Sequence, residues 1–160
     1  MVSRIVVREA VPDDAEEVAK LIARLKALNE ELDPHYKVVD NIDEVSMEYV
    51  REMMESGKAR VLVAVDSAVG SIVGVLIYRI VDRRFYVPRV KAQIVDFYVL
   101  PKYRGRRIGT LLLEKAAEMA KGDGAGMITV IYPALNTIAG RFYEAKSFID
   151  LAHEKYKRIY

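Results

Sequence analysis

The apolar positions at the start of the chain change from a short continuous run to a helical repeat. A run of apolar residues between charged ones predicts a first strand over residues 3–10. Asp13 followed by Glu16 is typical of a helix start with Asp13 as the N-cap, and Pro34 limits the end of this helix. Spacings of three and four indicate its buried face, formed by Val18, Leu21, Ile22, Leu25, Leu28 and Leu32.

The next part of the chain predicts a second helix and a hairpin. A loop over residues 33–42 leads to a shorter helix over 43–56, which ends where Gly57 follows. Two strand-like runs, 60–66 and 71–81, are separated by a short glycine-containing turn. An antiparallel hairpin is the simplest way to connect them.

Alternating side chains predict another strand over residues 90–99, which Pro101 ends. Successive side chains of a strand point to opposite faces of the sheet. One face is therefore predicted to hold Val95, Phe97 and Val99, and the other Ile94, Asp96 and Tyr98.

The C-terminal part predicts two more helices and two more strands. A glycine-containing loop leads to a helix that runs to about Lys121, followed by a strand over 126–132, a helix over 136–147 and a last strand over 148–160. The predicted order is β-α-α-β-β-β-α-β-α-β. This order predicts one mixed α/β (α+β) domain over residues 1–160.

Composition narrows the chemistry open to the chain. A chain of 160 residues, 52% hydrophobic and 30% charged, can bury one core. Cysteine is absent and only two histidines are present, so we expect no disulfide, no thiolate nucleophile and no metal site. The net charge of +2 does not by itself favour nucleic acid or a membrane surface as a partner.

The apolar segments of the chain are all short. None approaches the roughly 18 residues of a membrane span. The N-terminal segment MVSRIVVREA also lacks the long apolar region and the cleavage site of a signal peptide. We therefore expect a cytoplasmic protein without a membrane partner.

The segment RGRRIGT, residues 104–110, is a candidate anion site between a predicted strand and a predicted helix. Free N–H groups in the first turn of a helix, together with the positive end of its dipole, attract phosphate. Gly105 and Gly109 leave room for the backbone to approach a phosphate. The hydroxyl of Thr110 and three guanidinium groups add further donors, the latter from Arg104, Arg106 and Arg107.

Two other interpretations of this segment stay open. A solvent-exposed turn between a strand and a helix can carry the same glycines and arginines. The basic run KYRGRR, with its tyrosine, is also typical of nucleic-acid surfaces, but no such surface recurs along the chain, which disfavours nucleic acid. The glycine spacing fits neither GxGxxG nor GxxxxGK(S/T), so the common dinucleotide and P-loop motifs are disfavoured too.

Two motifs resemble those of the GNAT family of N-acetyltransferases. The family's pyrophosphate loop has the pattern (Q/R)-x-x-G-x-(G/A); Arg104 and Gly109 fill its first and last positions, and Arg107 stands at its middle glycine. Residues 136–148, NTIAGRFYEAKSF, are similar to the family's N-x-x-(A)-x-x-F-Y-x-x-x-G-F, with Ser147 in place of the glycine. The resemblance covers nearly the whole chain, and its second half looks loosely closest to diamine and polyamine acetyltransferases.

This resemblance implies a fold, a cosubstrate and a reaction. It implies a mostly antiparallel, twisted sheet flanked by helices, and direct transfer of the acetyl group of acetyl-CoA to a primary amine in a ternary complex. The amine would be a polyamine, another small amine, a lysine or a protein N-terminus. The residues implied in binding CoA are Phe97, Tyr98, Val99, Arg104, Gly105, Arg106, Arg107, Ile108, Gly109, Thr110, Asn136 and Phe142. The rival interpretation is a CoA-binding sensor or interaction module with little catalysis.

Acyl transfer from a thioester to an amine needs a proton for the departing thiolate and a neutral amine. The family motif places Tyr143 near the sulfur, and a phenol with a reference pKa of about 10 is protonated at neutral pH. Packing beside Phe142 on a buried helix face is the alternative role for Tyr143. Asp96 is the carboxylate candidate for a base acting through water, and an aspartate that bonds backbone at a distorted strand is its alternative. The family's oxyanion donor is a backbone N–H near Val99.

The predicted loop after the first helix lies in the region that covers the acceptor in this family. His35 and Tyr36 are either acceptor-site residues or exposed loop residues. Acidic side chains that suit a cationic acceptor surround them, namely Glu30, Glu31, Asp33, Asp40 and Asp43. A solvated helix end explains these charges equally well. The predicted last strand also offers an edge, over 149–160, through which two copies could form a homodimer.

Overall fold

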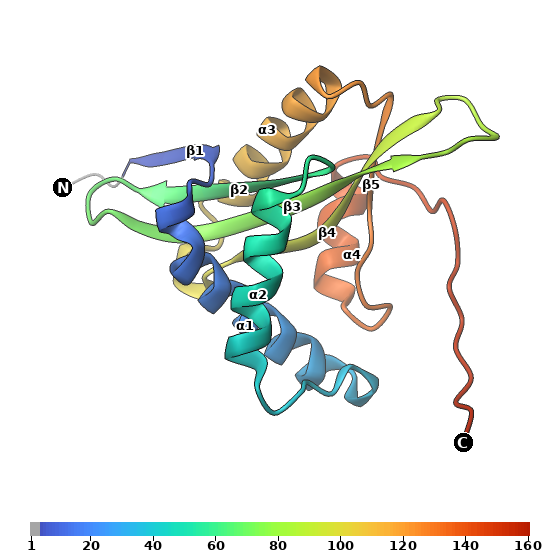
Figure 1. Ribbon diagram of the computed structural model, residues 1–160, viewed down its shortest axis with the longest axis horizontal. Helices are drawn as coiled ribbons and strands as arrows, with labels where there is room; N and C mark the ends of the chain where they lie inside the picture. Colours follow the sequence, from blue (N-terminus) through green and yellow to red (C-terminus); the bar gives the residue numbers. More distant parts are fainter. Residues whose placement is uncertain (1–3) are drawn as a thin grey trace.

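The computed structural model describes residues 4–160, which form one five-stranded sheet with helices on both faces (Figure 1). The strands are β1 (Ile5–Glu9), β2 (Ala59–Asp66), β3 (Ser71–Asp82), β4 (Val90–Val99) and β5 (Met127–Val130). The helices are α1 (Ala15–Leu32), α2 (Ile42–Glu55), α3 (Ile108–Gly122) and α4 (Thr137–Ala145). Short 3-10 turns precede α1, α2 and α3: η1 (Pro12–Asp14), η2 (Pro34–Tyr36) and η3 (Pro101–Tyr103). The first residue of the predicted strand 3–10 lies outside the described residues.

The sheet has the strand order β1-β2-β3-β4-β5 and is antiparallel except between β4 and β5. Helices α1 and α2 cover one face and α3 covers the other (Figure 1). Val18 of α1 and Val50 of α2 are buried on the first face, and Ile108 and Leu112 of α3 on the second. The mixed, mostly antiparallel sheet between helices confirms the predicted fold class, and the predicted hairpin of β2 and β3 forms.

A bulge in β4 changes the predicted alternation of side chains. Ile77 of β3 pairs with Asp96, but the next residue, Tyr78, pairs with Ile94, so Val95 is an extra residue in β4. A bulge resets which face each following side chain occupies. Ile94 consequently packs with α3, whereas Asp96 bonds to α1 and α2 on the opposite face. The prediction that Ile94 and Asp96 share a face is wrong.

The start of α1 also differs from the prediction. The sequence predicts the N-terminal cap at Asp13, but residues Pro12–Asp14 form a 3-10 turn and α1 begins only at Ala15. The carboxylate of Asp14, rather than that of Asp13, accepts a hydrogen bond from the Val11 N–H at 2.8 Å. Asp14 is also paired with Arg8 at 2.6 Å, which lowers the pKa of its carboxyl. A tertiary ion pair therefore decides which of two adjacent aspartates holds the turn.

The predicted last strand does not form. Residues 149–160 have no regular structure and extend away from the sheet toward the C-terminus (Figure 1). Their apolar side chains stay exposed, including Ile149, Leu151 and Ile159. A strand is stabilised by pairing its backbone groups with a neighbouring strand, and no strand of the described chain lies beside this segment. The predicted β-α-α-β-β-β-α-β-α-β order is therefore correct up to α4 and wrong after it.

Two features are absent from the part of the chain that the structure describes. None of its helices is both long and apolar enough to cross a bilayer. Nor does any group of three or more histidine, aspartate or glutamate side chains there have the arrangement to hold a metal ion.

Candidate active site

The parallel strands β4 and β5 separate halfway along β4 and leave part of its outer edge open. β5 pairs with β4 only from Lys91 to Ile94, and the last contact is the Ile131 N–H bonded to the Ile94 carbonyl at 3.0 Å. Over residues 95–99 the outer edge of β4 faces no other strand of the described chain. Unpaired N–H and C=O groups on such an edge can pair with another extended chain. This edge is the first component of the site.

A small cleft lies where the strands separate. Its volume is about 50 Å³, and α1, β4, β5 and α4 all contribute to it. The residues that line it are Leu25, Asn29, Ile94, Val95, Asp96, Phe97, Val130, Ile131, Tyr132, Pro133, Asn136, Ala139 and Tyr143. The cleft therefore brings together both predicted catalytic residues and two of the predicted CoA-binding residues.

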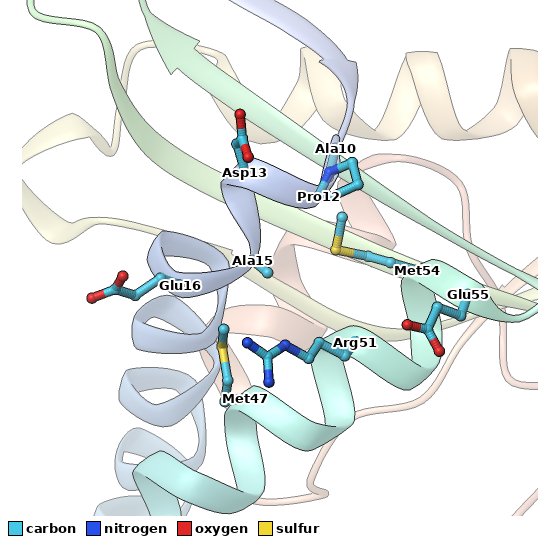
Figure 2. Close-up of a pocket in the computed structure, with 9 residues that line it drawn as sticks. All are labelled: Ala10, Pro12, Asp13, Ala15, Glu16, Met47, Arg51, Met54 and Glu55. Atoms are coloured by element: carbon cyan, nitrogen blue, oxygen red, sulfur yellow. The ribbon is translucent and has the colours of Figure 1, made fainter.

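A larger cavity lies elsewhere, between the start of α1 and the end of α2. Its volume is about 390 Å³, and Figure 2 shows the side chains around it, among them Asp13, Met47, Arg51, Met54 and Glu55. None of its lining residues is a predicted site residue. Size alone therefore does not identify the active site, and the small cleft is the candidate because of its chemistry.

The turn after β4 is the second component of the site. The first helical hydrogen bond of α3 runs from the Leu111 N–H to the Arg107 carbonyl, so the N–H groups of 108–110 precede it. Helix α3 has 15 residues, enough for a full dipole, and the turn passes through Gly105 at φ 78°. A Cβ added to Gly109 would lie 3.5 Å from the Phe142 ring and 3.6 Å from the Phe97 ring. Phe97 also lines the cleft, so the turn and the cleft adjoin at this ring.

Aromatic rings hold two arginines of this turn. The Arg104 guanidinium lies 5.3 Å from the Tyr98 ring centroid, and its Nε donates to the Val99 carbonyl at 3.0 Å. Arg106 lies 5.1 Å from the ring of Tyr103. The exposed guanidinium groups at the turn have no carboxylate partner, since the arginine ion pairs of the described chain are made by Arg8, Arg60 and Arg89. These positive charges are therefore available to bind an anion.

Arg107 and Ser147, the two residues that depart from the family motifs, both have an unusual backbone conformation. They are the residues other than glycine that have positive φ in the described chain, at 63° and 68°. Both stand where the family pattern has glycine. The chain therefore keeps the left-handed backbone that glycine allows, at a cost of about 1–2 kcal/mol for each side chain.

Replacing Arg107 by glycine is expected to stabilise the protein without ligand. Glycine relieves the left-handed strain of the folded state but also raises the conformational entropy of the unfolded chain, which costs about 0.4–1 kcal/mol. The first effect is the larger, so we expect the free energy of unfolding to rise by about 0.5–1 kcal/mol. The melting temperature should rise by about 1–4 °C. Calorimetry measures it, and Arg106→Gly, in the same turn but without positive φ, is the matched control. A decrease equal to that of the control would contradict the strain at residue 107.

Tyr143 is the buried aromatic residue of the cleft. The residue is 5% exposed, and its ring stacks on Tyr132 at 5.3 Å between centroids, with Phe97 and Phe148 packed edge-on. Burial, with a smaller contribution from Tyr132, raises the pKa of the Tyr143 phenol. The start of α4 is fixed by Asn136, whose Oδ1 accepts the Ala139 N–H at 3.0 Å. Tyr143 packs in the core, as one interpretation expected, and still borders the cleft as a protonated phenol.

Asp96 is held by groups from both helices that cover its face of the sheet. It is 2% exposed; one carboxylate oxygen lies 2.6 Å from Lys26 Nζ of α1, and the other accepts a hydrogen bond from the Tyr49 hydroxyl of α2. Burial, followed by the charge of Asp96, raises the pKa of Tyr49. Neither partner of Asp96 could be found from the sequence, because Lys26 and Tyr49 lie 70 and 47 positions away and no local pattern signals such a contact.

The remaining predicted residues differ in their access to the site. Ile108 is buried against the sheet, so only its backbone can face a ligand, and Tyr98 packs among the residues of α1 and α2. His35 lies in η2, paired with Asp33 at 2.8 Å and in contact with Tyr156, and it does not line the cleft. Tyr36 is exposed and does not line it either.

The comparisons with known proteins agree with this fold. Residues 25–148 match the Acetyltransferase (GNAT) family, and the chain belongs to this family of acyltransferase enzymes. No curated protein sequence matches the chain.

Three solved structures illustrate the similarity in fold. A tetramutant of the BH1408 protein from Bacillus halodurans has a TM-score of 0.85 and 22% identity, with 96% of this chain and 99% of that chain covered. The aminoglycoside N-acetyltransferase AAC(6')-Iy, solved with CoA, has a TM-score of 0.76 and 17% identity, covering 99% and 97%. The ribosomal-protein-alanine N-acetyltransferase from Brucella melitensis biovar Abortus 2308 has a TM-score of 0.74 and 20% identity, covering 99% and 100%.

Proposed function

We propose that this protein transfers the acetyl group of acetyl-CoA to a primary amine. The observation that carries the proposal is the departure of β5 from β4 after Ile94. It opens an edge of β4 immediately before the cationic turn at the start of α3 and beside Tyr143. An extended ligand with a pyrophosphate at one end and a thioester at the other fits these three features in the order in which they lie.

The residues around the cleft fit the parts of acetyl-CoA. The N–H groups of residues 108–110 and the guanidinium groups of Arg104, Arg106 and Arg107 would hold the pyrophosphate. The free edge of β4 over 95–99 would pair with the amide groups of the pantetheine arm, and Asn136 and Phe142 would border it. Acetyl-CoA supplies an acetyl group activated as a thioester.

The chain's own groups then position and move protons. The amine nitrogen attacks the carbonyl carbon, so the C–N bond forms as the C–S bond breaks. Tyr143 donates its hydroxyl proton to the departing sulfur, and the amine proton passes to solvent, from which Tyr143 is protonated again. A backbone N–H near Val99 would stabilise the negative charge that develops on the carbonyl oxygen. The raised pKa of Tyr143 keeps this acid protonated at neutral and mildly alkaline pH.

The class of acceptor is part of the proposal. The sequence resemblance favours polyamines, whereas two proteins of similar fold are named for aminoglycosides and for the alanine of a ribosomal protein. A primary amine is common to all three kinds of substrate. The acidic side chains of the segment 30–43, at the end of α1 and before α2, would attract the cationic form of such an acceptor.

Free thiol released from acetyl-CoA tests the proposal. We expect release that depends on at least one of three amines: spermidine, kanamycin and a peptide with an N-terminal alanine. Calorimetry should show that CoA binds in the same preparation. CoA binding without thiol release for any of these amines would favour the rival interpretation, a CoA-binding sensor or interaction module.

We also propose that two copies associate through the C-terminal segment. Residues 149–160 pair with no strand and expose Ile149 and Leu151, although Tyr156 contacts His35, and the outer edge of β5 has no strand beside it in the described chain. The mass in solution, measured by light scattering for chains ending at residue 160 and at residue 148, decides between a dimer that needs this segment and a monomer.

A further inference from the structure

Asn29 of α1 has an unsatisfied polar atom at the cleft. The residue is 7% exposed, and its Oδ1 is buried without a hydrogen-bond partner in the described chain. Buried side-chain oxygens are nearly always hydrogen-bonded, because a buried oxygen without a partner has lost its hydrogen bonds to water and gained none in exchange. An apolar residue at this position of a buried helix face would avoid this loss. The amide therefore calls for a partner that the folded chain does not supply.

The surroundings of Asn29 indicate where that partner lies. Asn29 lines the cleft together with Leu25, one turn earlier on α1, and with Asp96 and Tyr143 on the elements that face it. Lys26, three residues before Asn29, pairs with Asp96 at 2.6 Å. The side chain that carries the unsatisfied oxygen thus lines the same cleft as the phenol proposed to protonate the sulfur.

The charges at this point of the cleft nearly cancel. The carboxylate of Asp96 is compensated by Lys26 and accepts the Tyr49 hydroxyl, so its two oxygens are occupied. The Asn29 amide oxygen accepts hydrogen bonds but carries no charge. A cleft of this kind binds an N–H donor without strongly stabilising an ammonium ion, because desolvation disfavours the charged form of an amine.

We propose that the Asn29 amide oxygen accepts a hydrogen bond from the attacking amine and positions it, in its neutral form, for acyl transfer. The inference rests on the proposed function and adds to it a residue that binds the acceptor. A neutral primary amine has two N–H groups and one lone pair. One N–H bonded to Asn29 leaves the lone pair free to attack, and the neutral environment lowers the need for a strong base.

Two substitutions test this role, with the amine from the panel that gives the fastest thiol release as the probe. Asn29→Leu removes the acceptor atom with a similar branched shape. The amine KM should rise by about ten-fold or more, the acetyl-CoA KM should stay within two-fold, and the melting temperature should not fall, because the buried unsatisfied oxygen is removed. Asn29→Asp adds a charge that holds the ammonium form. In this variant the amine KM and kcat should both fall, and the acidic limb of the pH profile of kcat should move to higher pH.

A control and a binding measurement separate this inference from its alternatives. Asn41→Leu makes the same change at the exposed start of α2, outside the cleft, and should leave both KM values unchanged. Calorimetry with free CoA present should show weaker binding of spermidine or kanamycin to the Asn29→Leu protein. An unchanged amine KM and affinity would overturn the inference while wild-type thiol release still supports acetyl transfer. No thiol release from the wild-type protein would refute the proposed function itself.

Discussion

Replacing Tyr143 by phenylalanine is expected to lower kcat by about ten-fold or more and to leave the affinity for acetyl-CoA unchanged. The phenylalanine ring keeps the contacts with Tyr132 and Phe97, so the cleft should retain its shape. Only the proton donor for the departing thiolate is lost. Steady-state kinetics gives kcat, and calorimetry with CoA gives the affinity.

The control for this prediction is Tyr86→Phe, which removes an exposed hydroxyl from the loop between β3 and β4. It should behave as the wild-type protein. The protonated phenol is the active form, and burial raises its pKa, so the active range extends upward. We therefore expect no loss of kcat from this group between pH 7 and about pH 10, the reference pKa of tyrosine. Unchanged turnover in Tyr143→Phe would mean that another group protonates the sulfur.

Replacing Asp96 by alanine is expected to cost about 2–3 kcal/mol of the free energy of unfolding. The substitution leaves the hydroxyl of the half-buried Tyr49 without its acceptor and Lys26 without its partner. Removing one partner of a fully buried pair costs about 3–5 kcal/mol. The expected loss is smaller here because the Lys26 side chain is 36% exposed and can turn toward solvent. Denaturant unfolding measures the change, and Asp82→Ala, which breaks an exposed pair with Arg89, should cost less than about 1 kcal/mol.

Asp96→Asn separates the two roles of this residue. The amide keeps an oxygen that can bond to Tyr49 or Lys26, so this variant should lose less stability than Asp96→Ala and stay folded. The occupied carboxylate oxygens favour a positioning role, in which the amine KM rises and the pH profile of kcat keeps its shape. A large loss of kcat with loss of the acidic limb would identify Asp96 as the base, the role predicted from the sequence.

Much of the fold could be predicted from the sequence because its signals are local. β4 occupies the predicted residues 90–99, and β2 and β3 begin and end within one residue of their predicted limits. Helix starts at proline turns and the glycine-containing turn before α3 are likewise short-range features. The same holds for Tyr143 and Asn136, which the motif places on one helix and which the structure brings to one cleft.

The sequence by itself determined the order of elements up to α4, the cationic turn before α3 and the placement of Asn136 and Tyr143 at the start and on the body of α4, since each depends on residues a few positions apart. Only the tertiary structure decided the bulge at Val95, the pairing of Asp96 with Lys26 and Tyr49, and the burial of Asn29 without a partner. It also decided that residues 149–160 form no strand. The reason is physical: strand pairing and buried polar contacts join residues that are far apart in the chain, and their energy depends on the neighbour that the fold provides.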